Sequence, residues 1–464
     1  DALSLLPHLL PSAQDGTDEL LAAIAHQCSA KEVIMAAQEV LEHLRSDAEA
    51  EDVDDLSEGV NLAVLIECPW IIAIPRLTLR KSPSQVLAPL AELEQFVSTA
   101  AKSASVAESR SVVRCSSLLV QELGMWVEGR AGDNNAELTA SYAILTTFLD
   151  RTLEACADLI QSCVAQRAFE ACFPRLSVRS VIPGDWKDGQ DVVLLAVEAF
   201  GTLGRHLLFD PKPNLASLVV IAHTLAPNDP NVPLLVSAFP AILTSIQSNI
   251  ALDASLAILL KVLCVTPPPQ AELPAHIIIP LTTFLPSLCS AHPDASTRHI
   301  SFRILARVLQ IAPPMLRLQV LRDLMSPSED TSPRMRNAAI GLVKDSVLEA
   351  LSHPKTESVF ASPFLLQTIG PFIFRLESPD LLATIDGVDA SNDSPELARL
   401  VECLGLYYVL LLRDVENRTG VRDPGTIRSV ESSLLGPIRS ALGEYRKNTG
   451  RISCMRLLLE EPAR

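Results

Sequence analysis

The sequence predicts an all-α protein, a HEAT- or armadillo-like α-solenoid built from stacked helix pairs. Apolar residues make up 48% of the chain but aromatic residues only 4%, and leucine and alanine dominate the apolar set. No run of alternating valine, isoleucine and threonine is long enough to predict a sheet. Apolar runs with helical spacing alternate instead with proline-rich breakers, and two of these runs resemble each other.

The expected helices follow one another along most of the chain. Outside the repeated stretches described below they cover 19–45, 60–78, 86–101, 110–129, 136–171, 191–208, 214–225, 231–249, 254–265, 363–376, 395–413 and 426–447. Segments such as PNDPN, TPPPQ and SPSEDTSP are expected to be tight turns, and residues 46–58 an exposed acidic loop. Residues 178–191 are the best candidate for a joint, which predicts N-terminal repeats in 1–180 and C-terminal repeats in 191–464.

The stretch from Ser332 to Leu351 shows how one building unit is expected to fold. Its apolar side chains recur every three or four positions, which predicts one buried helix face and a solvated charged face. Ser332 is expected to cap the helix, and Pro333 suits its first turn because the missing N–H costs nothing there. The residues expected on the buried face are Met335, Ala338, Ala339, Leu342, Val343, Val347, Leu348 and Leu351.

A second stretch, 296–309, matches this one when Arg298 is set against Arg336, at an offset of 38 residues. HEAT and armadillo units repeat every roughly 40–47 residues, and in each unit a helix pair stacks on the next pair. Apolar runs at 274–292 and 314–325 precede the two stretches and would supply the other helix of each pair. The offset therefore favours a helical-repeat array.

Charge is unevenly distributed along the chain, whose net charge is −17. Residues 1–58 hold fourteen acidic residues against two basic ones, whereas residues 413–464 hold ten basic residues against seven acidic ones. Direct nucleic-acid binding needs a concentrated basic surface, and this slight excess does not provide one. A protein partner is the better expectation.

No motif in the sequence indicates catalysis or a cofactor. Nucleotide-binding glycine loops, the Gly-x-Ser-x-Gly elbow and the His-Glu-x-x-His zinc motif are all absent, so we expect no enzyme and no cofactor. The ten cysteines form no Cys-x-x-Cys pair, which favours reduced core thiols in a cytoplasmic or nuclear protein. The uncharged runs at 230–252 and 273–293 are long enough to span a membrane, but their polar and proline residues favour buried helices.

The stretch GLYYVLLLRDVENRTGVRDPGTIRSVESSLLGPIRSALGEYRKN, residues 405–448, resembles the C-terminal region of the glomulin family. That family also includes the plant aberrant-lateral-root-formation protein and the fungal Yap-binding proteins. The similarity consists of an apolar helix with Tyr407 and Tyr408, a polar turn and an LLGPI helix, and MRNAAIGLVKD also resembles a family helix. The residues of the turn are Asp414, Glu416, Asn417, Thr419 and Gly420.

This resemblance implies a non-enzymatic scaffold that binds the RING-box subunit of cullin-RING ubiquitin ligases. Proteins of this kind cover the surface that an E2 enzyme needs and so inhibit ubiquitin transfer. The fungal branch implies an alternative, a protein that binds a Yap-type bZIP transcription factor in peroxide stress signalling. An adaptor or transport scaffold with HEAT repeats but no relation to this family is a second alternative.

The partner-binding surface is expected in the C-terminal repeats, from about residue 370 to 464. The resemblance is densest there, the local charge turns positive, and arginine suits interfaces through its planar fork of donors. The turn residues have a simpler alternative role, which is only to build the turn that ends the preceding helix: Gly420 suits a left-handed conformation, and Asn417 can bond neighbouring backbone. The polar candidates for partner binding are Arg413, Arg418, Arg422, Arg439, Arg446 and Lys447.

Overall fold

The structure of the chain is a computed structural model. It describes residues 2–9, 17–50, 70–77, 81–101, 103–176, 184–205, 212–226, 231–265, 273–326, 332–353, 357–376 and 395–443. Over these residues the regular secondary structure is helical, with no strand, and successive helices pack against their neighbours. The prediction of an all-α solenoid is confirmed. Within the same residues, no helix is long and apolar enough to cross a membrane.

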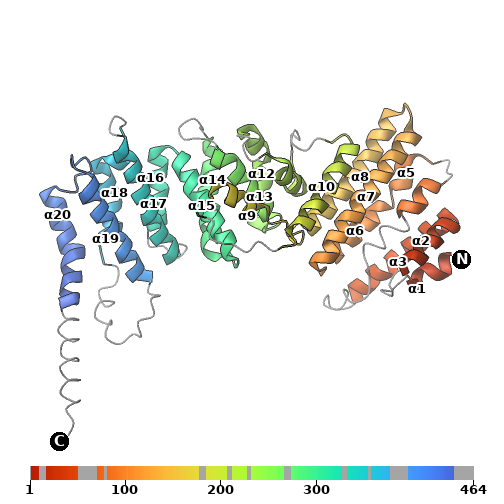
Figure 1. Cartoon of the computed structure of the whole chain (residues 1–464), viewed down its shortest axis with the longest axis horizontal. Coiled ribbons are helices and arrows are strands. Elements are labelled where there is room, and N and C mark those ends of the chain that lie inside the picture. Colours follow the sequence, from red (N-terminus) through yellow and green to blue (C-terminus); the bar gives the residue numbers. More distant parts are fainter. Residues whose placement is uncertain are drawn as a thin grey trace, which may run out of the picture. The chain divides into compact units, whose positions relative to one another are not determined.

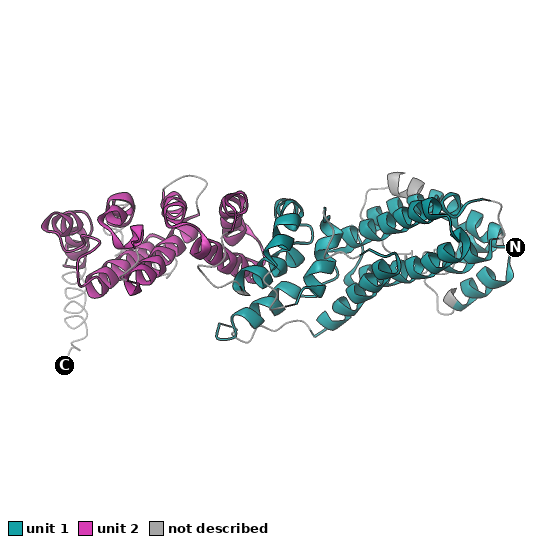
Figure 2. Cartoon of the chain, turned by 90° about the horizontal axis from the view of Figure 1, so that it is seen from above, with its two compact units in different colours: residues 1–267 teal, residues 268–464 magenta. Residues whose placement is uncertain are grey.

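The chain forms two compact units, residues 1–267 and 268–464 (Figure 2). The boundary therefore lies in the TPPPQ segment and differs from the joint predicted at 178–191. Helices before and after the predicted joint pack together, since α10 (Trp186–Thr202) lies against α7 (Val106–Ala131), and α11 (Leu215–Thr224) against α8 (Asn135–Cys156). The acidic segment also differs in part, because residues 46–50 belong to helix α3 and residues 51–58 lie outside the described residues.

Unit 1 contains the helices numbered up to α13. Those not yet given are α1 (Ala2–Leu9), α2 (Thr17–Gln27), α3 (Ala30–Ala50), η2 (Ile74–Arg76), α5 (Pro83–Leu87), α6 (Leu90–Ala100), α9 (Val164–Cys172), α12 (Val232–Ser248) and α13 (Leu252–Val265). A capping box between Ser105 and Glu108 starts α7, and asparagine side chains cap α8, α11 and α12. The last helix of unit 1, α13, packs with α9, α11 and α12.

One helix predicted in unit 1 is two helices in the structure. The run 136–171 was predicted without a break, but α8 ends at Cys156 and α9 begins at Val164. Gln161 and Cys163 in the connection both have a φ of 50°, a left-handed conformation that side chains other than glycine rarely adopt. Arg110 of α7 holds this connection through a hydrogen bond of 2.9 Å from Nε to the Ile160 carbonyl oxygen.

Unit 2 consists of successive helix pairs (Figure 1). Its elements are α14 (Ala275–Ala291), α15 (Ala295–Ile311), α16 (Pro314–Met325), α17 (Pro333–Ser352), η4 (Val359–Ala361), α18 (Pro363–Ile373), α19 (Pro395–Arg413), α20 (Pro424–Val430) and the π-helical turn η6 (Glu431–Leu435). Helix α14 packs on α15 and α16 packs on α17, as the repeat at 38 residues predicts. Helix α17 in turn packs on α19, which extends the array.

Helix α17 confirms most of the predicted building unit and corrects three details. Met335, Leu342 and Val343 are buried as predicted, but Ala338, Leu348 and Leu351 are half-buried, and Ile340, which was not predicted, is buried. Ser332 makes no capping hydrogen bond, so the helix begins at Pro333 without a side-chain cap. The charged face is also not simply solvated, because side chains on it contact α16 and α19, as described below.

Candidate functional site

Helix α19 is held in unit 2 by an apolar face and by one buried arginine. Leu400, Cys403, Leu406 and Leu410 are buried, and the Tyr407 ring packs edge-on against Phe374 at 5.5 Å between centroids. Burial, reinforced by the nearby charge of a glutamate in η6, raises the pKa of Tyr407. These contacts fix one side of α19 against the rest of the unit.

The buried arginine is Arg399, whose guanidinium group forms a bidentate ion pair with Glu396. Both contacts, from Nε and Nη2 to the two carboxylate oxygens, measure 2.6 Å. Nη2 also donates to the Arg375 carbonyl oxygen at 2.7 Å, just beyond the end of α18. Glu396 lies in the same helix, so this charge-assisted pair orients the guanidinium group. The bonds from Arg399 to the carbonyl oxygens of Phe372 and Arg375 are what tie α19 to the end of α18.

The opposite side of α19 carries a second apolar face, which is exposed. Val401 and Tyr408 are 67% and 66% exposed, and Val415 just after the helix is 74% exposed. Positions three, four or seven apart lie on one side of a helix, so these side chains form a continuous line. We call this line the α19 stripe, and it consists of Leu397, Val401, Tyr408, Leu412 and Val415.

Contiguous exposed apolar side chains on a soluble protein mark interaction sites more often than isolated ones do. The stripe is not a consequence of poor packing, because the same helix already has a fully buried face. Its polar surroundings are sparse: on the side towards α17, Lys344 pairs with Glu402 at 3.4 Å, and Asn337 donates to the Pro395 carbonyl oxygen at 2.9 Å. The arrangement therefore suits the binding of an apolar protein surface.

The polar turn after α19 is organised by one buried carboxylate. Asp414 is 1% exposed and accepts three hydrogen bonds, from the backbone N–H groups of Arg418 and Thr419 at 2.8 and 2.7 Å and from the Thr419 hydroxyl at 2.6 Å. Because all the donors come from the chain that immediately follows, the carboxylate closes the turn on itself. Asp414 and Thr419 therefore build the turn and are not available to a partner.

Asn417 and Gly420 complete this turn, and both have positive φ, 55° and 74°. The Asn417 side chain accepts a bond from the Arg422 N–H and donates to an Asp423 carboxylate oxygen, each at 2.8 Å. A Cβ atom on Gly420 would lie 2.9 Å from the other Asp423 oxygen. The expected left-handed turn is thus confirmed at Gly420, and of the five turn residues only Glu416 is exposed.

The predicted arginines lie in different environments. Arg413 is exposed at the last position of α19, Arg418 is half-buried, and Arg422 is exposed but donates from Nη2 to the Leu411 carbonyl oxygen at 2.7 Å. Arg439 lies beyond η6 and pairs with Glu431. Arg413, Arg418 and Arg422 are thus brought to one end of α19. Arg446 and Lys447 lie outside the described residues.

The predicted candidates were the charged residues near the end of α19, and the apolar stripe was not predicted. A signal for the α19 stripe is present in the sequence, because apolar residues at 397, 401, 408 and 412 repeat with helical spacing alongside a second set at 400, 403, 407 and 410. A helix that is apolar on two sides must either be buried on both sides or bind something. Within the described residues, no group of three or more histidine, cysteine, aspartate or glutamate side chains is arranged to hold a metal ion.

An array of helix pairs with an exposed apolar face near one end defines the class of protein, a helical-repeat scaffold that binds other proteins. Comparison with known families then identifies the kind of scaffold. The model of an uncharacterised protein family described as YAP/Alf4/glomulin matches residues 233–452, and this part of the chain belongs to that family. The match runs from α12 through the whole described part of unit 2 and includes the α19 stripe and its turn. No curated protein matches the chain.

Proposed function

We propose that this protein binds the RING-box subunit of a cullin-RING ubiquitin ligase through the α19 stripe and the turn that follows it. Binding there would cover the surface that the E2 enzyme needs and so inhibit ubiquitin transfer. The observation that carries the proposal is the α19 stripe, an exposed apolar line inside the family-matched part of the chain. In this proposal the protein acts in the cytoplasm and also reaches the nucleus.

The composition of this region matches the anatomy of a protein interface. Interface cores are apolar and rich in aromatic residues, whereas their rims are polar and solvent-accessible. Val401 and Tyr408 lie along the middle of the stripe, and burying each such side chain fully contributes roughly 1.5–3 kcal/mol before the costs of association. Arg413 and Arg422, at the end of the helix, are suitably placed for the rim.

Masking requires no chemistry from this protein. A bound scaffold inhibits by occupying space, so its effect depends on affinity and on the position of the contact alone. The rigid attachment of α19, through Arg399 on one side and Asp414 at its end, supports this mechanism because the stripe is held in place before binding. Rigid presentation lowers the conformational entropy that binding removes.

The test is a ubiquitination assay with a purified cullin–RING-box complex, its E2 enzyme and the full chain. We expect inhibition by the unmodified chain and a loss of binding of at least about tenfold with Val401→Asp and Tyr408→Asp together, because both charges would be buried at the contact. A matched control is Met315→Asp, which places the same charge on another exposed apolar position of unit 2, 56% exposed, and is expected to inhibit normally.

A second variant separates the polar rim from the apolar core. Changing Arg413, Arg418 and Arg422 together to glutamate is expected to weaken binding less than the stripe variant and mainly to slow association, since rim charges act on encounter. No binding of the RING-box complex by the unmodified chain would remove the proposal. Equal binding by the stripe variant would leave the partner but remove this surface.

One observation favours a second candidate function, binding of a bZIP transcription factor in peroxide signalling. Five of the eight cysteines within the described residues are half-buried rather than buried, contrary to the prediction of core thiols. Partial exposure is a requirement for thiol chemistry with a partner. A chain that leaves the RING-box complex unbound but forms a mixed disulfide with such a factor after mild peroxide treatment would support this function instead.

A further inference from the structure

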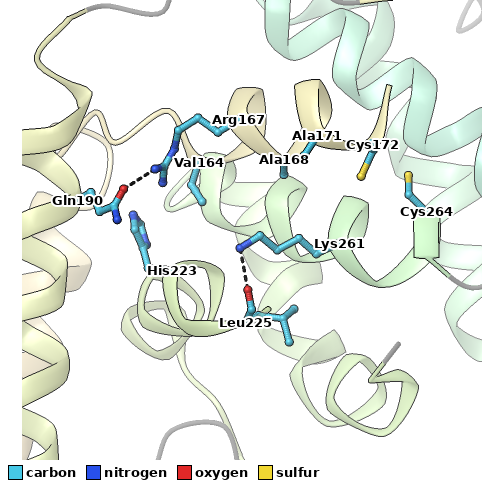
Figure 3. Close-up of a pocket in the computed structure, with 10 residues that line it drawn as sticks. All are labelled: Val164, Arg167, Ala168, Ala171, Cys172, Gln190, His223, Leu225, Lys261 and Cys264. Carbon is cyan, nitrogen blue, oxygen red and sulfur yellow. Dashed lines mark hydrogen bonds between the residues drawn. The ribbon is translucent and has the colours of Figure 1, made fainter. Parts of the chain in front are cut away.

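A cavity of about 460 Å³ lies within unit 1, between α9, α10, α11 and α13 (Figure 3). Its walls carry polar, charged and sulfur-containing side chains, namely Gln190, His223, Arg167, Lys261, Cys172 and Cys264. It is separate from the α19 stripe and plays no part in the proposed binding of the RING-box subunit. The combination of two thiols and a lysine in one cavity points to a chemistry of its own.

The two cysteines come from different helices and face each other. Cys172 is the last residue of α9, and its sulfur lies 3.9 Å from the carbonyl oxygen of Leu260 in α13. Leu260 precedes Cys264 by four residues, one helical turn, so Cys172 is positioned against the same turn that carries Cys264. Figure 3 shows the two sulfur atoms pointing toward one another. Both cysteines are half-buried thiols.

Lys261 supplies a fixed positive charge on the same side of α13. Its Nζ atom donates to the carbonyl oxygens of Ala222 and Leu225 at 2.7 and 2.9 Å, which anchors the side chain at the end of α11. Lys261 and Cys264 are three residues apart and so lie on one helix face. A hydrogen bond with the Cys264 thiol and the charge of Lys261 lower the pKa of Cys172, although burial opposes them.

Other cysteines of the chain have the opposite environment. Burial raises the pKa of Cys156 and of Cys289 to about 12, and burial together with the nearby carboxylate of Asp253 raises the pKa of Cys163. The thiolate is the reactive form of cysteine, so these three are poorly disposed to react. Cys172 thus has the more reactive environment, and it has a second thiol beside it.

The two helices are also tied to each other independently of the cysteines. The Asp253 carboxylate of α13 accepts hydrogen bonds from the first backbone N–H groups of α9, those of Val164 and Ala165, at 2.8 and 3.0 Å. The α9 and α13 backbones are therefore already held side by side. A covalent bond between cysteines requires such an approach, because disulfide geometry tolerates little separation of the two backbones.

We propose that Cys172 and Cys264 are a redox-active pair that a hydroperoxide converts reversibly into an intramolecular disulfide. In the first step the Cys172 thiolate attacks a peroxide oxygen, the O–O bond breaks, and sulfenic acid forms on Cys172 with release of water or an alcohol. In the second step the Cys264 sulfur attacks the Cys172 sulfur, the S–O bond breaks and water leaves. The two thiols lose two electrons in total, which the peroxide accepts, and an external dithiol returns them.

The test is peptide mapping of the full chain after brief treatment with a small excess of hydrogen peroxide. Thiols are then alkylated without reduction, and the digest is analysed by mass spectrometry. We expect a cross-linked peptide pair that contains Cys172 and Cys264, is lost after treatment with a dithiol, and joins cysteines of the same chain, with no disulfide between chains. Lys261→Gln is expected to slow the loss of the Cys172 thiol at least about threefold, because it removes the nearby positive charge.

Cys163→Ser is the matched control, since Cys163 is also half-buried and adjoins the start of α9, and it should leave the cross-link unchanged. Cys264→Ser should leave sulfenic acid on Cys172, trapped by a 1,3-dione reagent. The proposal is overturned if both thiols of the unmodified chain are still alkylated after peroxide treatment. It is equally overturned if Cys172 proceeds to sulfinic acid without the cross-link, or if it pairs with another cysteine or another chain. Circular dichroism confirms that each variant is folded.

Discussion

Helices α17 and α19 occupy neighbouring positions in unit 2 and pack against each other, but their outer surfaces differ in chemical character. The polar residues of α17 are used within the unit: Lys344 pairs with Glu402, Asn337 bonds to the start of α19, and Glu349 pairs with Arg317 of α16 at 2.8 Å. The outer side of α19 instead carries Val401 and Tyr408 in exposed positions. The polar side chains of α17 thus connect helices within the unit, whereas α19 exposes apolar side chains to solvent.

This difference teaches that a repeat helix is not identified as a binding element by its charges. The stretch 332–351, with arginines and a Lys-Asp pair, has the more conspicuous sequence, but the structure uses most of that polarity to connect three helices. The proposed binding element, α19, is distinguished instead by apolar side chains that stay exposed although its other side is packed. Four variants test the comparison, in decreasing order of expected effect on stability.

The largest effect is expected from Leu342→Asp, in the buried face of α17. An unpaired carboxylate would replace a buried side chain, and we expect a loss of about 4 kcal/mol in the free energy of unfolding. Chemical denaturation followed by circular dichroism measures this loss. Leu348→Asp on the same helix is the control, and it should cost clearly less because Leu348 is half-buried. Equal losses for the two variants would contradict the burial described for α17.

Arg399→Met should have the next largest effect, about 3 kcal/mol, because it leaves the Glu396 carboxylate and two backbone carbonyl groups without their charged donor. Denaturation with urea gives the value. Arg428→Met, at an exposed position of α20, removes the same charge and is expected to change stability by less than about 0.5 kcal/mol. If Arg399→Met were equally mild, the guanidinium group would not be what holds α19.

Gly420→Ala is expected to cost about 1–2 kcal/mol, since alanine is strained at a φ of 74° and its Cβ would press on Asp423. Gly425→Ala, in α20, has open space around the added methyl group and serves as the control. Differential scanning calorimetry compares the two. A neutral result for Gly420→Ala would show that the turn after α19 adapts easily.

The smallest effect on stability is expected from the stripe variant, Val401→Asp with Tyr408→Asp. Both side chains are largely exposed, so the free energy of unfolding should change by less than about 0.5 kcal/mol for each. The same variant should nevertheless weaken partner binding at least about tenfold, which would separate the surface role proposed for α19 from the structural role of α17. A destabilisation comparable to that of Leu342→Asp would instead mean that the stripe is covered within the protein.

Much of the fold follows from the sequence because helix starts and apolar spacing are local. Helix α17 begins at Pro333 as predicted, and α18 and α19 likewise begin at a proline that follows a serine, Pro363 and Pro395. Capping by Ser332 was wrong, since its side chain makes no capping bond. The break between α8 and α9 was missed because neither glycine nor proline marks it, and a contact from Arg110 stabilises it from a distant helix.

The site was harder to predict because it depends on contacts between distant parts of the chain. Spacing alone cannot tell which of two apolar sides of α19 is covered by neighbours, so Tyr407 and Tyr408 look alike in the sequence and differ in the structure. Ile340 of α17 is buried for the same reason, since α16 and α19 both pack against that helix. Likewise, Cys172 and Cys264 are far apart in sequence, and only the packing of α9 on α13 brings them together.

The straight course of the α19 stripe also sets a minimum size for anything that binds it. At 1.5 Å per residue, Leu397 and Leu412 are about 22 Å apart along the helix axis. Covering that length requires a folded surface, or about four turns of a partner helix, and a short linear motif would reach only part of it. Affinity should therefore fall in steps as a partner is truncated, and its smallest fully active fragment should be a folded domain or a helix of at least about four turns.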